Sequence, residues 1–159
     1  LSQADRLGDK PALEIVGNSP SILTFLEGKD AVLRTATGLL ESGAQKGDRV
    51  LLQLGNTPDF PVVYLAAIAV GILPVPLSSQ LTQSELEVVA RITSPVLCLQ
   101  ADDLPKVALP TLKASDIRAF QQLPLATFEM GDPNRPAYIV FTSGTSGEPR
   151  AVVHAHRAN

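Results

Sequence analysis

The sequence has little of what marks a disulfide-stabilised or nucleic-acid-binding protein. It contains one cysteine, Cys98, so an internal disulfide framework is excluded. Basic residues are outnumbered by acidic ones: 13 Lys plus Arg against 16 Asp plus Glu give a net charge of −3. A chain without a basic excess cannot hold the phosphate backbone of a nucleic acid strongly, so general nucleic-acid binding is not expected.

Targeting and membrane-spanning segments are also missing. The start of the chain lacks the basic, apolar and small-residue regions of a signal peptide, and we expect a cytoplasmic protein. The uncharged run from Phe60 to Leu77 is 18 residues long, near the minimum for a membrane span. Gly71, Pro74 and Pro76 interrupt its second half, so the run predicts a buried helix followed by a buried strand.

The composition is that of a folded globular chain. Hydrophobic residues make up 45% and charged residues 18%, which excludes wholesale disorder. The length of 159 residues is usual for one domain. Because the chain begins at Leu1 rather than Met and shows no terminating pattern before Asn159, we expect a piece of a longer protein.

Strands and helices are predicted to alternate over the first hundred residues. Apolar spacing from Asp30 predicts a helix that ends near Gly43. Thr57 suits the N-cap of a second helix reaching Val70, and the capping box Thr82–Glu85 begins a third. Apolar runs predict strands at 11–16, 21–26, 50–54, 72–77 and 95–99. This order predicts an α/β fold, with a layered, mostly parallel sheet flanked by helices.

The rest of the chain divides into two parts. Residues 100–135 hold four prolines and one weak helical stretch at 115–122, and we interpret them as a surface connection to a second sheet region. Residues 136–159 form a strand, a loop and a second strand. We therefore expect a βα-layered core over 1–99, a connecting segment over 100–135 and a loop-bearing hairpin over 136–159.

The loop between those last two strands carries the chemistry. Its two glycines let the backbone turn and approach a ligand closely, so that successive N–H groups can bind an anion. Hydroxyl groups and one arginine would add further donors. The pattern is neither a Walker A loop nor a dinucleotide fingerprint, and it lacks the serine elbow of hydrolases. The candidate residues are Thr142, Ser143, Gly144, Thr145, Ser146, Gly147 and Arg150. Chemistry alone leaves three interpretations of this segment open: a phosphate-binding loop, a structural loop, or a loop that carries a catalytic serine.

The same segment carries a resemblance. Tyr138–Arg150 resembles the signature of the acyl-adenylate-forming (AMP-binding) superfamily, which includes acyl-CoA synthetases, peptide-synthetase adenylation domains and luciferases. Val153–Arg157 is most similar to acyl-CoA synthetases. Earlier blocks of that family are matched in the same order by Lys46–Val50, Asn56–Phe60, Leu65–Gly71 and Pro74–Leu77.

The resemblance implies an ATP-dependent acyl-CoA synthetase, an acid–thiol ligase that forms an acyl-AMP intermediate from a carboxylic acid. Its cofactors would be ATP, Mg²⁺ and coenzyme A. The residues carried over as the ATP-phosphate loop are Thr142, Ser143, Gly144, Thr145, Ser146, Gly147 and Arg150, with Arg150 in the place of a frequent Lys. No residue here matches the family's catalytic lysine or acidic metal ligand, which come later, in the missing C-terminal part of the enzyme. We therefore assign no catalytic or metal-binding residue and predict that this N-terminal fragment alone is inactive.

Some alternatives stay open at this point. The chain could be a truncated homologue that acts as a non-catalytic phosphate- or partner-binding module. An orphaned fragment would instead expose 60–77 and the sheet edge at 136–142 and would self-associate. His154 and His156 would share a face of a strand, and a metal would need further ligands. Cys98 lies in an apolar run typical of a core.

Overall fold

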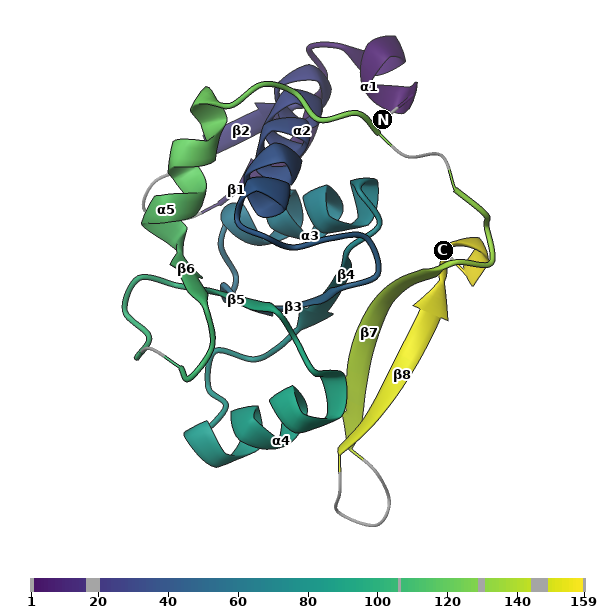
Figure 1. Cartoon of the computed structure of the whole chain (residues 1–159). Coiled ribbons are helices and arrows are strands. Elements are labelled where there is room, and N and C mark those ends of the chain that lie inside the picture. Colours follow the sequence, from purple (N-terminus) through teal and green to yellow (C-terminus); the bar gives the residue numbers. More distant parts are fainter. Residues whose placement is uncertain (1, 17–20, 106, 129–130, 144–148, 159) are drawn as a thin grey trace.

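The computed structural model describes residues 2–16, 21–105, 107–128, 131–143 and 149–158 (Figure 1). Its helices are α1 (Ser2–Leu7), α2 (Phe25–Glu41), α3 (Asp59–Ala69), α4 (Gln83–Thr93), α5 (Ala114–Ala119) and the short 3-10 helices η1 (Phe120–Gln122) and η2 (His156–Ala158). Its strands are β1 (Pro11–Ile15), β2 (Ser21–Thr24), β3 (Arg49–Gln53), β4 (Leu73–Pro76), β5 (Leu97–Gln100), β6 (Thr111–Lys113), β7 (Pro136–Ser143) and β8 (Pro149–Ala155).

A four-stranded parallel sheet forms the centre of the molecule. Its strand order is β4-β3-β5-β6, and every neighbouring pair is parallel. Val50 of β3 faces Pro74 on one side and Leu97 on the other. Figure 1 shows α2 and α3 on one side of this sheet and α4 on the other. The structure confirms the α/β fold with a parallel sheet flanked by helices.

Successive residues of each central strand point to opposite layers. In β3, Leu52 joins the core under α2 and α3, whereas its neighbour Leu51 joins the core under α4 and β7. In β5, Leu99 and Cys98 divide in the same way. This alternation follows from the two-residue period of a strand, and burial on both faces explains why these strands are continuously apolar. Cys98 is fully buried, which confirms its expected place in the core.

Helix α2 begins earlier than the sequence predicted. The expected strand 21–26 ends at Thr24, and the helix starts at Phe25 rather than Asp30. A capping box sets this boundary, because Glu27 N donates to Thr24 Oγ1 (3.2 Å) and Thr24 N donates to a Glu27 carboxylate oxygen (3.0 Å). The apolar residues around Thr24 hid this helix start.

The predicted N-cap is wrong for α3 and confirmed for α4. The side chain of Thr57 does not cap α3, because its hydroxyl donates to the Leu54 carbonyl oxygen (3.0 Å). The residue directly before α3 is Pro58, whose backbone already has helical geometry. The capping box at α4 is confirmed: Thr82 N donates to a carboxylate oxygen of Glu85 at 2.8 Å. The expected strands at 50–54, 72–77 and 95–99 are confirmed as β3, β4 and β5 with slightly shifted ends.

The segment 100–135 does more than connect two sheets. It contributes β6, which extends the parallel sheet beside β5. The helical stretch expected at 115–122 is confirmed as α5 and η1. Strands β7 and β8 then form a separate antiparallel sheet that packs against β4 (Figure 1).

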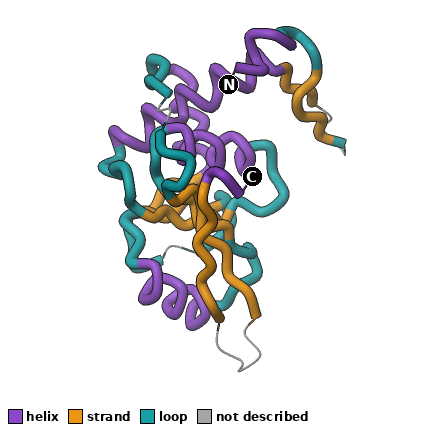
Figure 2. The backbone as a smooth tube through the Cα atoms, turned by 90° about the vertical axis from the view of Figure 1, so that its right-hand side faces the viewer, coloured by secondary structure: helices purple, strands orange, loops and turns teal. Residues whose placement is uncertain are grey.

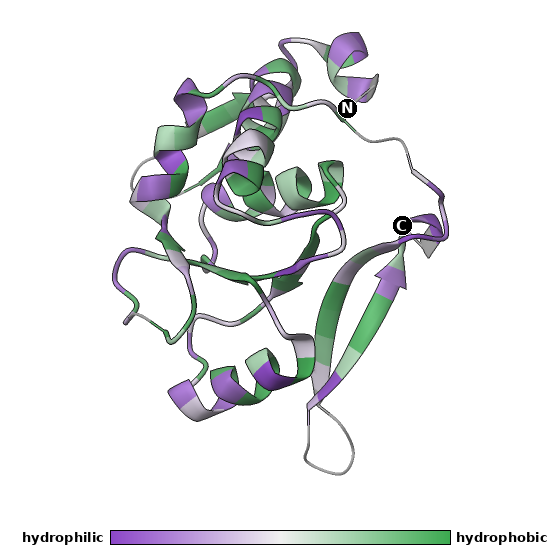
Figure 3. Ribbon diagram, viewed as in Figure 1, coloured by the Kyte–Doolittle hydropathy of each residue, from purple (hydrophilic) through white to green (hydrophobic). Residues whose placement is uncertain are grey.

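The long uncharged run is a helix and a strand, as predicted. It forms α3 and β4, and Val63, Ala66 and Val75 are fully buried. Figure 3 shows that α3 and the central strands are predominantly hydrophobic. Within the described residues, no helix has the length and apolar character needed to cross a membrane. Most side chains of segment 60–77 are buried or half-buried in this structure. The solvent exposure expected of an orphaned fragment is therefore limited to one side of α3, at Leu65.

Candidate functional site

Strands β7 and β8 lead into the candidate loop and form an antiparallel hairpin (Figure 1). β7 ends at Ser143 and β8 begins at Pro149, and these two residues face each other across the ladder. Thr142 faces Arg150 one step further in. The remaining loop residues assigned from the sequence, Gly144, Thr145, Ser146 and Gly147, lie outside the described residues. The structure thus places three of the seven residues, all on the strand ends that lead into the loop.

The hairpin is fixed to the rest of the molecule along β7. Ile139 is buried in the same cluster as Leu51, Leu73 and Val75, and Phe141 packs against that cluster. At the opposite end of the hairpin from the loop, the backbone N–H of His156 and Arg157 donate to the carbonyl oxygens of Arg135 (3.1 Å) and Pro133 (2.8 Å). The strand ends that carry the loop are therefore held by a packed base rather than by a flexible linker.

Thr142 and Arg150 are cross-strand partners at the strand ends that lead into the loop. Residues directly opposite in an antiparallel pair present their side chains on the same face of the ribbon. A hydroxyl donor and a guanidinium group are thus neighbours at the entrance to the loop, and both residues are exposed to solvent. A guanidinium group binds phosphate oxygens in a bidentate way, and its charge makes each bond stronger than one from a neutral donor.

A cavity of about 440 Å³ adjoins these strand ends. It lies between α4, the chain leaving β4 and the hairpin, and Thr142, Phe141 and Pro149 contribute to its lining. In open parallel α/β sheets, ligands bind beyond the carboxyl ends of the strands, and β4 ends at this cavity. The strand ends that lead into the loop therefore lie at the edge of the sheet where a ligand is expected.

The cavity itself does not suit a polyphosphate. Its described lining includes Glu85 and no Lys or Arg. Hydrogen bonds from the backbone and the side chain of Thr82 lower the pKa of Glu85, which keeps this carboxylate charged at neutral pH. A negative charge in the lining disfavours an anion in this cavity.

Aromatic side chains join the hairpin to α3. Tyr138 and His154, which face each other across the ladder, stack with ring centroids 4.7 Å apart and an angle of 5° between their planes. The ring centroid of Tyr64, in α3, lies 5.8 Å from that of Tyr138. Burial, and to a lesser extent the electrostatic effect of Tyr138, raises the pKa of Tyr64 to about 12. Its hydroxyl therefore stays protonated at neutral pH, and the three rings act as packing between layers.

The two histidines do not share a strand face, because β8 ends at Ala155 and His156 begins η2. Burial and the neighbouring Arg135 lower the pKa of His156, so its ring is neutral near pH 7. Among the described residues, no group of three or more His, Cys, Asp or Glu could hold a metal ion.

A buried polar network at the sheet edge was missed by the sequence reasoning. Gln53 and Gln100 are cross-strand neighbours at the carboxyl ends of β3 and β5, and both are almost completely buried. Gln100 Nε2 donates to Gln53 Oε1 at 2.9 Å, and Lys113 Nζ donates to Gln100 Oε1 at 3.3 Å. The strand order of the sheet reverses between β3 and β5, which is where ligands bind in many α/β folds. Here the two side-chain amides bond to each other, and the network links β3, β5 and β6. The sequence signal that could have revealed this network is the glutamine at the end of each of the two apolar strands β3 and β5.

Comparisons with known proteins agree on one family. Residues 2–159 match the model of the AMP-binding enzymes. A 4-hydroxybenzoate–CoA/benzoate–CoA ligase from Rhodopseudomonas palustris is 31% identical, and the match covers 84% of this chain and 28% of that enzyme. A 3-hydroxybenzoate–CoA ligase from an Aromatoleum species is 30% identical and covers 96% of this chain and 32% of that enzyme.

Solved structures agree on the fold. The N-terminal subdomain of NpsA from Klebsiella oxytoca, solved with 3-hydroxybenzoyl-AMSN, superposes with a TM-score of 0.83 at 24% identity and covers 98% of this chain and 39% of that one. An acyl-CoA synthetase from Brucella canis gives a TM-score of 0.83 at 23% identity and covers 97% of this chain and 32% of that one. The chain thus spans about a third of the length of these relatives.

Proposed function

Because the chain belongs to the family of AMP-binding enzymes, we propose that it is the N-terminal part of an ATP-dependent acid–thiol ligase. The observation that carries this proposal is the loop between β7 and β8, entered by Thr142 and Arg150 on one face of a fixed hairpin. In the first half-reaction, a carboxylate oxygen attacks the α-phosphorus of ATP, and pyrophosphate leaves as acyl-AMP forms. In the second, the thiolate of coenzyme A attacks the acyl carbonyl carbon and AMP leaves.

The proposed role of the loop is to bind the β- and γ-phosphates and to orient the leaving pyrophosphate. Negative charge grows on that group as the bond to the α-phosphorus breaks, and donors already in place stabilise it without reorganisation. We assign this role to Thr142, Ser143, Gly144, Thr145, Ser146, Gly147 and Arg150. Mg²⁺ bound with ATP would neutralise part of the phosphate charge, and no described residue is assigned to it.

We propose an aromatic carboxylic acid as the substrate class. This rests on the relatives, because those from Rhodopseudomonas and Aromatoleum are ligases of benzoate or hydroxybenzoates. The described residues of this chain do not by themselves select an acid. The acyl pocket would be completed by the part of the ligase that this chain does not contain, in keeping with its share of about a third of each relative.

The proposed organisation follows from the same reasoning. Residues 1–99 form the layered core, 100–135 the connecting segment with β6 and α5, and 136–159 the loop-bearing hairpin of one larger adenylation domain. A chain that holds the phosphate loop without the rest of that domain would not form acyl-AMP.

The test is acid-dependent ATP–pyrophosphate exchange by the protein encoded by the complete reading frame. A panel of benzoate, hydroxybenzoates, acetate and a medium-chain fatty acid separates the acid classes. We expect exchange with at least one aromatic acid and little with the aliphatic acids. Exchange with the aliphatic acids alone would overturn the substrate class and leave the ligase standing, whereas no exchange with any acid would overturn both.

A further inference from the structure

Two cross-strand pairs lie on the same face of the β7–β8 hairpin. Thr142 faces Arg150, and four residues further from the loop Tyr138 faces His154. Side chains alternate between the two faces of a strand, so pairs that are four residues apart share a face. The neighbouring residue Ile139 lies on the other face and is buried in the core under α4. The stacked rings and the proposed phosphate-binding pair therefore share the face that does not enter that core.

The two strands of this hairpin are anchored unequally. β7 packs into the core through Ile139 on one face and contacts α3 through Tyr138 on the other. In β8, all residues from Pro149 to Val153 are exposed, and burial begins at His154. Figure 2 shows the two strands running side by side along the face of the molecule that is turned to the viewer. The side chain of His154 is thus the first along β8 to be half-buried.

A row of aromatic rings connects β8 to the core. His154 stacks on Tyr138 with ring centroids 4.7 Å apart and an angle of 5° between the ring planes. Tyr138 lies 5.8 Å from Tyr64 of α3, at an angle of 56°, and Phe60 continues the row 6.0 Å from Tyr64. All three separations fall in the range of favourable contacts between aromatic rings. The row therefore runs from β8 through β7 to α3.

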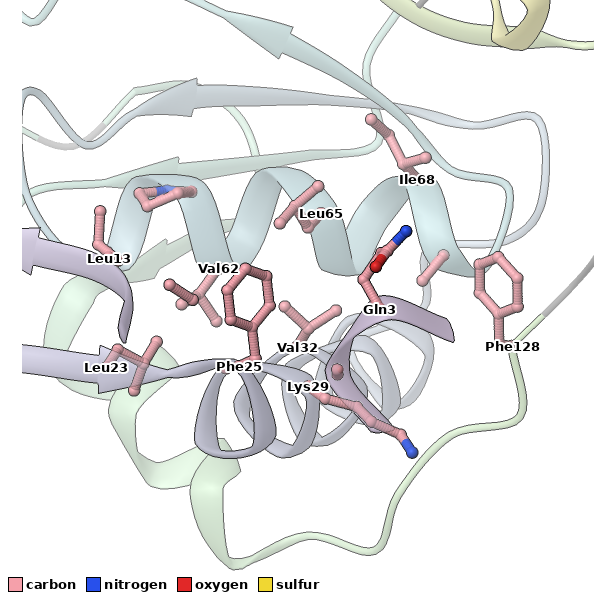
Figure 4. Close-up of a pocket in the computed structure, with 15 residues that line it drawn as sticks. Gln3, Leu13, Leu23, Phe25, Lys29, Val32, Val62, Leu65, Ile68 and Phe128 are labelled. Carbon is pink, nitrogen blue, oxygen red and sulfur yellow. The ribbon is translucent and has the colours of Figure 1, made fainter. Parts of the chain in front are cut away.

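Helix α3 is a firm support for this row. Val63 and Ala66 pack into the core beneath the helix and are fully buried. In Figure 4, Val62 and Leu65 of α3 point toward Phe25 of α2, and the two helices pack against each other. A helix that is held by both the sheet and α2 gives the rings a fixed reference.

The freedom that remains to the hairpin is its twist. Two-stranded ribbons twist more strongly than larger sheets, and a two-stranded sheet alone is marginally stable in water. Since β7 is held on both faces, a change of twist moves β8 and shifts the backbone of Arg150 relative to Thr142. A parallel ring stack fixes the spacing and the tilt of a cross-strand pair, so the stack of His154 on Tyr138 opposes such a change.

We infer that His154 is a positioning residue, whose stack on Tyr138 holds β8 so that Arg150 and Thr142 meet the phosphates of ATP together. The inference rests on the proposed function, because it assumes that Arg150 binds those phosphates. His154 acts through the strand rather than by contact, since four residues of strand separate it from Arg150 by about 14 Å. That distance is too long for both side chains to bind the same terminal phosphates.

ATP–pyrophosphate exchange by the protein from the complete reading frame tests the inference, with ATP and the acid varied in turn. His154→Ala should raise the KM for ATP about three- to tenfold, the effect of losing one ring contact. The KM for the acid should stay unchanged, because the affected contact is the one to the phosphates. Val153→Ala is the matched control: it truncates the neighbouring side chain, which is 56% exposed and lies on the opposite face, and it should leave both KM values unchanged.

Two further variants at the same position separate the ring stack from general packing. His154→Phe keeps a planar ring and should retain the wild-type KM for ATP, whereas His154→Leu keeps apolar bulk without a ring and should resemble His154→Ala. A wild-type KM for ATP in His154→Ala would overturn the inference. An effect on the KM for the acid alone, or an equal effect in Val153→Ala, would also overturn it.

Calorimetric titration of the same longer protein with ATP and Mg²⁺ gives a readout that needs no turnover. Arg150→Gln and His154→Ala should each bind ATP more weakly than the wild type. The double variant should bind no more weakly than Arg150→Gln, because His154 acts through Arg150. Fully additive losses in the double variant would overturn the inference.

The two assays together keep this inference apart from the proposed function. If no acid supports exchange but the expected pattern of ATP binding is found, the ligase activity is overturned and the positioning role stands. If exchange occurs and Arg150→Gln weakens ATP binding while His154→Ala does not, the positioning role alone is overturned. Absence of both exchange and ATP binding would overturn the two proposals together.

Discussion

Gly38 of α2 provides the surface on which the ring of Phe120 packs. A Cβ atom built at Gly38 would lie 2.5 Å from Cδ1 of Phe120 and closer still to Cγ. Neighbouring bonds hold the two segments together: Gln121 Nε2 donates to Thr35 Oγ1 (3.1 Å), and Thr37 Oγ1 donates to the Pro124 carbonyl oxygen (2.7 Å). The segment after β6 is thereby fixed on the outer surface of α2.

Replacing Gly38 with Ala should destabilise the fold. The added methyl group would overlap the Phe120 ring, and overpacking of this kind costs about 1–3 kcal/mol. Gly28→Ala in the same helix is the matched control, because its Cβ would lie an ordinary 3.4 Å from Leu23 Cδ2. That change should stabilise the protein by about 0.5–1 kcal/mol through the higher helix propensity of alanine. Urea unfolding of the two variants measures both effects.

The double variant Gly38→Ala/Phe120→Ala identifies the cause. If the ring is what the new methyl group meets, the two changes together should cost less than the sum of the single changes. Strict additivity would show that the loss at Gly38 has another origin.

Acid should weaken the capping boxes of α2 and α4. Hydrogen bonds from Thr24 and Thr82 lower the pKa values of Glu27 and Glu85 below their ordinary value of 4.5. A lowered pKa in the folded state gives stability that is present above the ordinary pKa and is lost as the pH falls through the folded one. The urea midpoint of the wild-type chain should therefore drop between about pH 6 and about pH 3.

The variant Glu27→Gln/Glu85→Gln should show a smaller drop over the same pH range, because the ionisable partner of each cap is gone. Glu14→Gln, in β1, controls for the loss of a negative charge elsewhere. An identical pH dependence in the wild type and the double variant would contradict the role assigned to the two carboxylates.

Cys98 should be unreactive in the folded protein. Burial raises the pKa of its thiol to about 12, so the thiolate needed for attack is almost absent at about pH 8, and the sulfur is also shielded from reagent. A disulfide reagent added to the native chain should release no measurable chromophore over minutes, and full reaction should follow when urea is added. Rapid reaction of the native chain would place the thiol outside the core.

The 159-residue chain should not activate an acid. It contains the loop entrance at Thr142 and Arg150, but it covers only about a third of the ligases it resembles. ATP–pyrophosphate exchange with the acid panel should stay at the level of a reaction without protein. Acid-dependent exchange by this chain alone would contradict the prediction.

Local patterns in the sequence predicted the elements whose signals are local. The central strands β3, β4 and β5 are uninterrupted apolar runs, and Thr82 and Glu85 have the spacing of a capping box. The same box at Thr24 and Glu27 went unnoticed, because the apolar residues around it also fit a strand. β6 has three residues, too few for a periodic signal.

Relationships between distant residues were beyond sequence reasoning. Gly38 and Phe120 are far apart in the chain, and nothing local shows that one leaves room for the other. The pairing of Gln53 with Gln100 required the strand register. For the candidate site, residue types alone located the loop, and the structure added that Thr142 faces Arg150 on a fixed hairpin. The phosphate-binding role itself stays a prediction.

The most direct measurement is ATP–pyrophosphate exchange by the longer protein carrying Arg150→Gln, with Arg91→Gln on the exposed surface of α4 as control. Loss of a charged hydrogen bond to the leaving pyrophosphate should slow exchange by about 10- to 100-fold. Arg150→Lys should recover part of that loss, and both variants should unfold at the wild-type urea concentration. Exchange at the wild-type rate in Arg150→Gln would contradict the assignment of this loop to the phosphates of ATP.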